Sequence, residues 1–284
     1  MLNVTKGIVL SGGSGSRLFP LTTVVNKQLL PVFDKPMIYY PISTLINLGI
    51  SDICIISSKE YISFYKKLFS NALSLGLNIS YETQDAPNGI AESFIICKEF
   101  IRNDPVALIL GDNVFHRLPK ITRFKNGATV FAYKVEDPER YGVVEFSKNG
   151  KAISIEEKPK SPKSNYAIPG LYFYDNDVVR RAEILAPSER GELEITDLNK
   201  SYLKDGKLNV IKLEDGIAWL DAGTPTALAQ SSDYVQAVQE RQGQKIACIE
   251  EDCLNAGFIS KSNFFKLVNS MPKSDYKNYL LKRI

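Results

Sequence analysis

Hydrophobic and polar residues in the first half of the chain follow two different periods. Short aliphatic and β-branched runs, typical of buried strands, occupy residues 7–10, 52–56, 78–83 and 106–110. Apolar residues spaced three and four apart predict helices over 37–48, 60–75 and 90–101. Strands that alternate with helices are typical of an α/β fold with a doubly wound, mostly parallel sheet. We therefore predict a Rossmann-like, nucleotide-binding half over about residues 1–125.

The pattern changes to closely spaced strands in the second half. Strands are predicted over 128–135, 141–146, 151–156, 166–174, 208–213 and 217–220, and helices over 175–185, 194–203 and 225–242. Lys148-Asn149-Gly150 is an Asn-Gly turn signal that predicts a hairpin. We expect one domain over 1–243, with a β-rich part over about 126–243. A helical appendage over 244–284, with helices from about 252 and a last one over 275–284, is expected to pack on the same domain.

Charge and cysteine content exclude several classes of function. The 35 basic and 32 acidic residues nearly balance, and they form no long cationic run, so neither a nucleic-acid surface nor a polybasic membrane surface is indicated. No apolar run approaches the length of a membrane-spanning helix, and we expect a cytoplasmic protein. The four cysteines are predicted to be buried and reduced. His116 is the sole histidine, which argues against a histidine metal site or a catalytic triad.

A glycine-rich turn, Ser11 to Ser16, follows the first strand directly. Gly12, Gly13 and Gly15 allow backbone N–H groups to approach an anion closely, and Arg17 and Lys27 supply positive charge. The turn has neither the Walker A spacing nor the G-x-G-x-x-G dinucleotide fingerprint. It indicates a phosphate-binding loop of another kind, although an ordinary strand-to-helix turn is equally compatible with the glycines alone.

Two carboxylates follow apolar strands at similar places. Asp112 stands in ALILGDN and Asp221 in IAWLDAGT. Ligands of open α/β sheets gather at the carboxyl ends of strands, and Mg²⁺ commonly binds through one or two carboxylates together with substrate phosphates. We predict a Mg²⁺ site made by this pair. For each acid taken singly, capping of the following turn is an equally good explanation.

GGSGSRLFPLT and NKQLLPVFDKP resemble the signature of the nucleotide-sugar pyrophosphorylases, most closely the glucose-1-phosphate thymidylyltransferases, and the resemblance extends along nearly the whole chain. It implies a nucleotidyltransferase-type sheet with a β-rich sugar-binding insertion. It also implies that dTTP and glucose 1-phosphate are condensed to dTDP-glucose and pyrophosphate, for dTDP-rhamnose-type deoxysugar and cell-surface polysaccharide synthesis, by a homotetramer. A sugar phosphate is an anionic nucleophile near neutral pH, so no general base is required.

The same resemblance implies roles for individual residues. The nucleotide-binding residues would be Gly12, Gly13, Gly15, Gln84 and Gly89, and the sugar-binding residues Tyr141, Gly142, Glu157 and Lys158. Catalysis would rest on Arg17, Lys27 and Lys158, and the metal on Asp112 and Asp221. A glutamine offers both a donor and an acceptor to a thymine edge. Arg190 and Glu192 also match a family motif, but an acid-rich helix start explains them adequately, and Trp219 is expected in the core.

Alternatives remain open within and beyond this class. One is a sister pyrophosphorylase that uses UTP or another hexose 1-phosphate, because one methyl discriminates by only about 1 to 3 kcal/mol. Another is a catalytically silent nucleotide-sugar sensor or regulatory subunit. The chain departs from the family pattern at Ala222 and at His116-Arg117. The second departure, with residues 250–257, lies where the family has a regulatory site for the end-product sugar nucleotide, so feedback control is less firmly implied than catalysis.

Overall fold

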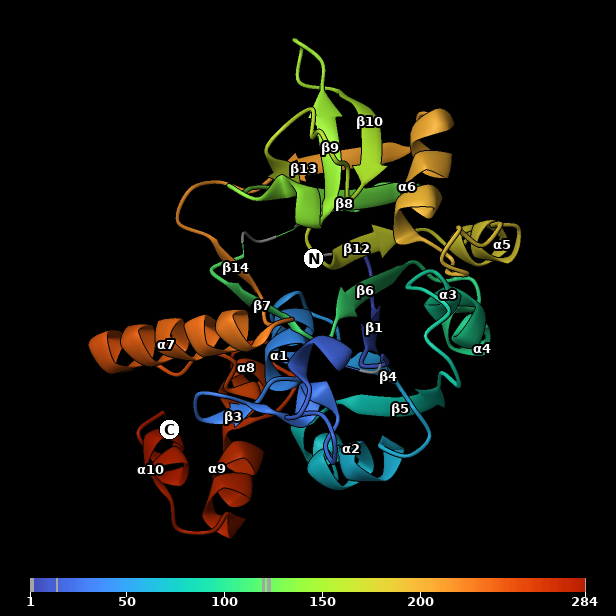
Figure 1. Ribbon diagram of the computed structural model, residues 1–284. Helices are drawn as coiled ribbons and strands as arrows, with labels where there is room; N and C mark the ends of the chain where they lie inside the picture. The colour runs from blue at the N-terminus through green and yellow to red at the C-terminus, as the bar shows by residue number, and fades with distance from the viewer. Residues whose placement is uncertain (1–2, 14, 119–120, 122–123, 284) are drawn as a thin grey trace.

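A large mixed sheet forms the centre of the molecule (Figure 1), as seen in a computed structural model that describes residues 3–13, 15–118, 121 and 124–283. Its strands are β1 (Lys6–Leu10), β4 (Asp52–Ser57), β5 (Asn78–Thr83), β6 (Val106–Leu110), β8 (Ala128–Lys134), β9 (Gly142–Phe146), β10 (Ala152–Glu157), β11 (Tyr166–Ala167), β12 (Leu171–Tyr174) and β13 (Leu208–Lys212). Their order is β10-β9-β11-β8-β12-β6-β1-β4-β5, and β13 pairs with β8. The predicted α/β class and doubly wound mixed sheet are confirmed.

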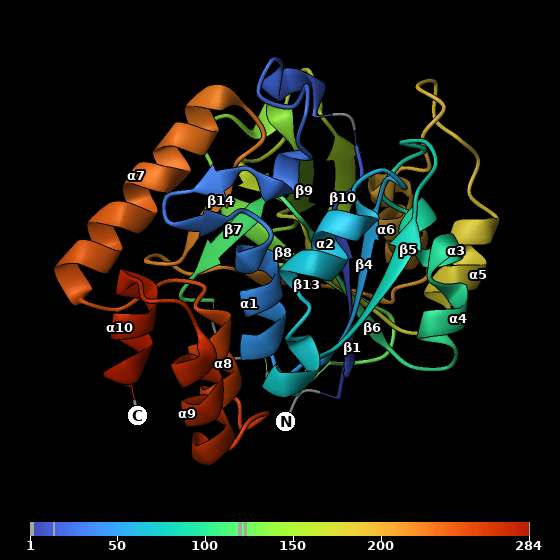
Figure 2. The ribbon, with the colours of Figure 1, turned by 90° about the horizontal axis from the view of Figure 1, so that it is seen from below.

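Helices cover both faces of this sheet (Figure 2). They are α1 (Tyr39–Asn47), α2 (Ile62–Leu68), α3 (Glu92–Ile96), α4 (Lys98–Ile101), α5 (Val178–Glu183), α6 (Ile195–Lys204), α7 (Pro225–Gln242), α8 (Ile249–Asn255), α9 (Lys261–Ser270) and α10 (Asp275–Leu281). Among the described residues, none of these helices is long and apolar enough to cross a membrane.

The parallel part of the sheet explains why its strands read as continuous apolar runs. β1 pairs in parallel with both β4 and β6, so that Ile8 lies beside Cys54 and Leu108. Successive side chains of a strand point to opposite faces. Val9 therefore belongs to the core beneath α1 and α8, whereas Ile8 belongs to the core beneath α3, α5 and α6. A strand buried on both faces carries no polar alternation.

The second half adds antiparallel strands to this parallel part. β12 joins it to β6, and β9 and β10 form the hairpin predicted from the Asn-Gly turn, with Gly142 opposite Glu157. Gly150 adopts a φ of 78°, the left-handed conformation that such a turn requires. The predicted helix over 225–242 has the predicted bounds.

Three predicted elements are interrupted. The helix over 60–75 ends at Leu68 and is followed by the 3-10 turn Ala72–Leu75, and the helix over 90–101 breaks at Cys97, whose φ and ψ of −91° and 18° leave the α-helical region. The strand over 166–174 is two short strands separated by Ile168, Pro169 and Gly170. Apolar spacing is compatible with these breaks, because it reports which face is buried and not whether the backbone bonds are continuous.

Three short strands were not expected, and the strand predicted over 217–220 pairs outside the main sheet. β7 (Asn113–His116) and β14 (Ala218–Asp221) form a separate antiparallel ribbon, and β2 (Pro31–Val32) pairs with β3 (Lys35–Pro36). Asp221 therefore does not end a strand of the parallel sheet, as its sequence context indicated. It reaches Asp112 because the ribbon places it opposite Asn113.

The C-terminal helices share the core beneath α1. Ile249, Cys253, Phe264 and Leu280 are buried in the same cluster as Ile42. The first of these helices begins at Ile249, three residues before its expected start, and Ile284 of the last predicted helix lies outside the described residues. All four cysteines are buried free thiols, as predicted.

Candidate functional site

Hydrogen bonds to other elements hold the glycine turn and the turn that carries Lys27 in place. The backbone N–H of Ser11 donates to Ile56 O at 2.7 Å, which ties the turn to β4. Asn26 begins the 3-10 turn Lys27–Leu29 by accepting from Gln28 N at 3.1 Å, and the Tyr65 hydroxyl donates to the same Asn26 oxygen at 2.6 Å. Lys27 thus projects from a buried turn. Ser14, within the predicted loop, lies outside the described residues.

Asp112 and Asp221 meet beside this turn. Gly111 N donates to Leu10 O at 2.9 Å, so that the end of β6 lies against the end of β1. A side chain at Gly111 would collide with Ser11 and Gln28, so the close approach requires glycine. Ala222 N donates to Asp112 O at 3.0 Å and brings the end of β14 to the same place.

Lys27 and Asp112 form a largely buried ion pair, with side chains 9% and 16% exposed. Burial acts to raise the pKa of Asp112, but the positive charge and hydrogen bond of Lys27 and a hydrogen bond from Asn113 outweigh it and hold that pKa below its usual value. Among the described residues, no side chain forms a comparable ion pair with Asp221. Burial, followed by the negative charge of Asp112, raises its pKa to about 6, although Lys27 and Arg17 oppose this rise.

A cavity of about 540 Å³ collects most of the predicted catalytic, sugar-binding and metal-binding side chains. It is lined by Arg17, Asp112, Tyr141, Gly142, Glu157, Lys158 and Asp221. The guanidinium of Arg17 lies against Gly223, where an added Cβ would come within 2.8 Å of Nη2. Glu157 accepts a hydrogen bond from Thr196, and Lys158 lies 3.6 Å from the other Glu157 oxygen.

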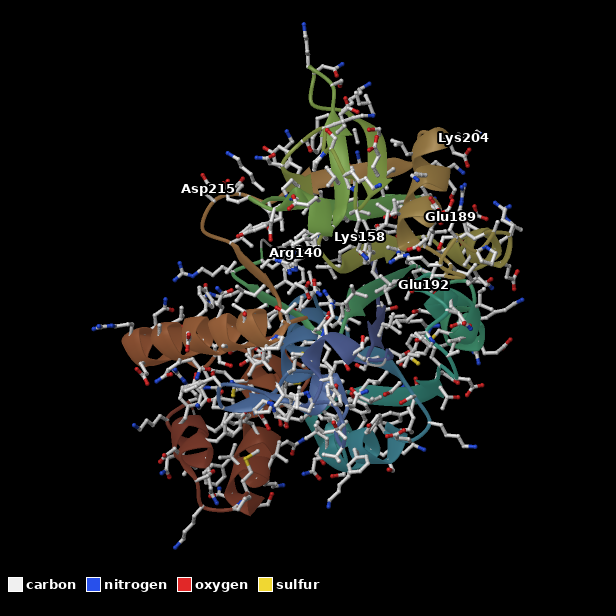
Figure 3. The ribbon with its side chains drawn as sticks, in the orientation of Figure 1. Arg140, Lys158, Glu189, Glu192, Lys204 and Asp215 are labelled. Atoms are coloured by element: carbon white, nitrogen blue, oxygen red, sulfur yellow. The ribbon has the colours of Figure 1, made fainter. Side chains whose placement is uncertain are left out.

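Lys158 has an unusual backbone for a lysine. Its φ is +42°, which favours glycine, and its N–H donates to Tyr141 O at 3.0 Å. Figure 3 shows Lys158 and Arg140 where the β8–β10 part meets the parallel part of the sheet. The side chain is half exposed, so its ammonium group is free to meet an anion that enters the cavity.

A second cavity of about 250 Å³ holds the predicted nucleotide residues Gly13 and Gln84 together with Lys27. Lys27 therefore lines the smaller cavity and pairs with Asp112 of the larger one. Gln84 is 6% exposed, and its Nε2 donates to Glu92 Oε2 at 2.7 Å. The two cavities are joined by the buried Lys27–Asp112 pair.

The other three glycines predicted to bind the nucleotide line neither cavity, but each makes a close contact that an added side chain would disturb. An added Cβ on Gly12 would lie 2.3 Å from Gln84 Oε1, and one on Gly15 would lie 2.8 Å from Thr22 Cγ2. Gly89 has a φ of +106° and packs against the Leu193 backbone, with an added Cβ 2.4 Å from Leu193 O. Gly89 thus shapes the loop between Gln84 and α3. Its contact with the nucleoside stays a prediction.

Several cavity residues were missed or left aside from the sequence. The larger cavity is also lined by Asn113, Arg140, Arg190, Glu192, Thr196 and Trp219. Trp219 is buried in the core, as expected, but it lines the cavity as well, and its Nε1 donates to Asn113 Oδ1 at 2.6 Å. Asn113 stands next to Asp112 and Trp219 two residues before Asp221, so proximity to the predicted metal ligands was an available signal.

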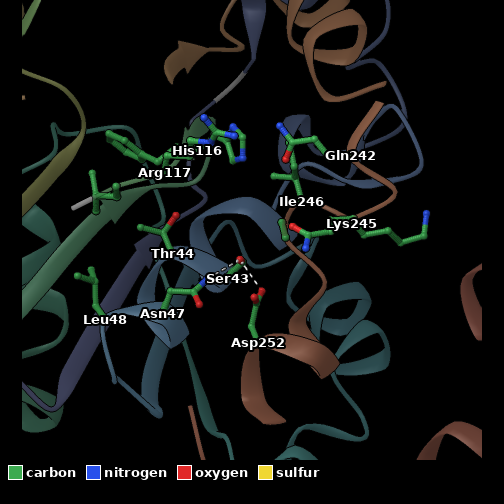
Figure 4. Close-up of a pocket in the computed structure, with 14 residues that line it drawn as sticks. Ser43, Thr44, Asn47, Leu48, His116, Arg117, Gln242, Lys245, Ile246 and Asp252 are labelled. Atoms are coloured by element: carbon green, nitrogen blue, oxygen red, sulfur yellow. Dashed lines mark hydrogen bonds between the residues drawn. The ribbon is translucent and has the colours of Figure 1, made fainter. Parts of the chain in front are cut away.

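A third cavity of about 330 Å³ lies away from these two, between α1, β7 and the segment before α8. Figure 4 shows His116 and Arg117 on one side, and Gln242 and Lys245 on the other. His116 Nδ1 lies 2.8 Å from the Tyr234 hydroxyl, and burial, followed by the charge of Arg117, lowers the pKa of His116. The region where the chain departs from the family pattern thus still forms a cavity.

Comparisons with known proteins point to one family of enzymes. A family model described as nucleotidyl transferase matches residues 6–237. A glucose-1-phosphate thymidylyltransferase of Neisseria meningitidis serogroup A is 51% identical over 98% of both chains, and one of Xanthomonas campestris is 47% identical over 97% of this chain and 95% of its own.

Solved structures show the same fold. A Bacillus anthracis protein in complex with sucrose, provisionally assigned as a glucose-1-phosphate thymidylyltransferase, aligns with a TM-score of 0.75 and 42% identity over 82% of this chain and 95% of its own. A UDP-glucose pyrophosphorylase complexed with UDP-glucose aligns with a TM-score of 0.71 over 83% of this chain and 99% of its own. At 20% identity, the second alignment speaks for the fold alone.

Proposed function

We propose that this chain, which belongs to the nucleotidyl transferase family, condenses dTTP with glucose 1-phosphate to dTDP-glucose and pyrophosphate. One observation carries the proposal. Arg17, Lys158 and the two aspartates line one cavity, and the Lys27–Asp112 pair joins it to the cavity of Gln84. The names of relatives about half identical over nearly their whole length support the choice of substrates.

The chemistry that these residues support is an in-line displacement at phosphorus. An oxygen of the sugar phosphate attacks the α-phosphorus of dTTP, and the bond from that phosphorus to pyrophosphate breaks. The nucleophile is already anionic, because the second pKa of a phosphate monoester is near 6, so no protein base must remove a proton. The sole histidine, His116, lines the third cavity and neither of the other two.

Fixed positive charges would align the reactants and offset the charge of the phosphates. We assign Lys158 to the incoming sugar phosphate, because its half-exposed ammonium lies at the cavity beside Glu157. Arg17 is assigned to the leaving pyrophosphate and Lys27 to the phosphates between the two cavities. Tyr141, Gly142 and Glu157 would contact the hexose, and Gln84 the base, with Gly12, Gly13, Gly15 and Gly89 shaping the nucleotide-binding loops.

The carboxylate pair fits Mg²⁺. Two buried carboxylates stand close enough for the charge of Asp112 to raise the pKa of Asp221, an arrangement that a bound cation would relieve. Among the described residues, no group of three or more acidic, histidine or cysteine side chains could hold a metal. Asp112 and Asp221 would therefore share the ion with phosphate oxygens, as is usual for Mg²⁺. The ion would supply charge neutralisation at those phosphates.

Two further proposals come from the sequence, the first from its lack of a long apolar run and the second from the family resemblance. We infer a cytoplasmic location, which the four buried free thiols support. We also infer a homotetramer, to be tested by light scattering at several protein concentrations.

Pyrophosphate release tests the proposed reaction directly. Purified protein with Mg²⁺ is incubated with each nucleoside triphosphate and with glucose, galactose or mannose 1-phosphate in turn. The expected result is that dTTP with glucose 1-phosphate is the best pair. dUTP, which differs from dTTP only by the C5 methyl, is expected to be used less well by a factor of about 10 to 200, the worth of one methyl. Binding of nucleotide sugars with no pyrophosphate from any pair would overturn the proposal and indicate a sensor instead.

A further inference from the structure

The side-chain amide of Gln84 is held by two groups that only accept hydrogen bonds. Its Nε2 donates to Glu92 Oε2 at 2.7 Å and to the backbone oxygen of Gly89 at 3.4 Å. A carboxylate and a peptide carbonyl have no proton to donate. The reversed amide would place Oε1 against both oxygens, so the chemistry of the neighbours determines which end of the amide faces them.

Glu92 is itself fixed. It is the first residue of α3, and its other carboxylate oxygen accepts from Asn88 Nδ2 at 2.8 Å. Both oxygens of Glu92 therefore have partners, and the side chain cannot turn away from Gln84 without breaking a hydrogen bond.

The opposite end of the amide faces the glycine turn. An added Cβ on Gly12 would lie 2.3 Å from Gln84 Oε1, so this oxygen occupies the space that the absent side chain leaves. Gln84 also lines the 250 Å³ cavity with Gly13 and Lys27. Within the part of the chain that the structure describes, no group donates a hydrogen bond to Oε1. The cavity thus presents an acceptor that a ligand with an N–H group can meet.

We propose that Glu92 is a positioning residue for base selection. By holding Nε2, it makes Gln84 an acceptor only, so the base must bring a ring N–H. This inference rests on the proposed function, which assigns the cavity to the base. This inference also revises the role predicted from the sequence, in which the Gln84 amide offered the base both a donor and an acceptor.

The pyrimidine bases differ at ring nitrogen N3, the atom that would face Gln84 Oε1. Thymine and uracil carry a proton on N3, whereas N3 of cytosine is an acceptor and would face Oε1 lone pair to lone pair. Sites that must satisfy a buried hydrogen-bonding group discriminate more strongly than sites that sense a methyl. The contact therefore separates thymine and uracil from cytosine, and it does not separate thymine from uracil.

Binding of dUTP and dCTP isolates this contact, because the two share sugar, phosphates and the lack of a methyl. We would measure both dissociation constants by calorimetry with Mg²⁺ and without sugar phosphate. Wild type is expected to bind dUTP at least twentyfold more tightly than dCTP. Glu92→Ala frees the amide to turn Nε2 toward cytosine, so the ratio should fall at least fivefold. Glu92→Gln, which can still accept from Nε2, should keep the ratio within twofold of wild type.

Glu99→Ala is the matched control, because it removes an exposed glutamate of the neighbouring helix α4 without touching Glu92 or Gln84, and it should also keep the ratio. A merely structural role of Glu92 would weaken dUTP and dCTP equally. That result, or a wild-type ratio below threefold, would overturn the inference.

Two further measurements keep the test decisive. If Glu92→Ala does not fold, wild type is titrated with N3-methyl-dUTP, which lacks the N3 proton; affinity equal to that for dUTP would refute the contact. If no sugar phosphate yields pyrophosphate while the dUTP preference and its response to Glu92→Ala persist, the proposed reaction fails and the base-selection inference stands.

Discussion

At the scale of single residues, the buried Lys27–Asp112 pair is the contact on which the proposed chemistry depends most. We predict that Lys27→Met lowers kcat/KM at least 100-fold, because a fixed charge at a reacting phosphate is worth about 3 to 4 kcal/mol. Lys98→Met is the control, since Lys98 pairs with Glu183 at 2.7 Å on the surface, with side chains 58% and 40% exposed, and such pairs contribute little. The measurement is steady-state pyrophosphate release by protein shown to be folded by circular dichroism. Activity of Lys27→Met within tenfold of wild type would contradict the mechanism.

At the scale of elements, α8 is joined to α1 by a carboxylate that titrates. Asp252 accepts from the Ser43 hydroxyl at 2.6 Å, and burial raises its pKa to about 6 (Figure 4). Because this folded pKa lies above that of the unfolded chain, the contribution of Asp252 to stability is full below about pH 4 and is lost as the pH rises through 6. Asp252→Asn should therefore stabilise the protein by about 1 to 3 kcal/mol at pH 7.5 and by much less at pH 4.5, as measured by urea unfolding. An equal effect at both pH values would refute this, and the exposed Asp233→Asn serves as the control.

At the scale of the whole molecule, the shared core predicts a single unfolding transition. Phe264 of α9 is fully buried in the cluster that also contains Trp219, the sole tryptophan. Phe264→Ala should cost about 3 to 5 kcal/mol and shift tryptophan fluorescence and far-UV dichroism to the same lower urea concentration. Phe265→Ala, at a neighbouring side chain that is 48% exposed, should change stability by less than about 1 kcal/mol. Separate fluorescence and dichroism midpoints would show that residues 244–284 unfold independently.

The fold was predictable as far as local patterns determine it. Runs such as residues 106–110 identified the parallel strands, because a strand buried on both faces must be apolar throughout. The Asn-Gly turn identified the β9–β10 hairpin for an equally local reason. The pairing of β7 with β14 was not predicted. Each strand has only four residues, and the two are separated by about a hundred positions, so no local sequence pattern indicates that they pair.

Residue types alone identified the chemical groups available at the site: the glycine turn, two aspartates, and the cations Arg17, Lys27 and Lys158. How these groups combine depends on contacts between distant parts of the chain. Lys27 pairs with Asp112 across 85 positions, the ribbon brings Asp221 beside that pair, and Glu92 leaves Gln84 with only an acceptor to offer. The physical reason is that residue type sets what a side chain can donate, accept or neutralise, whereas burial and distant neighbours decide which of those capacities remains free for a ligand.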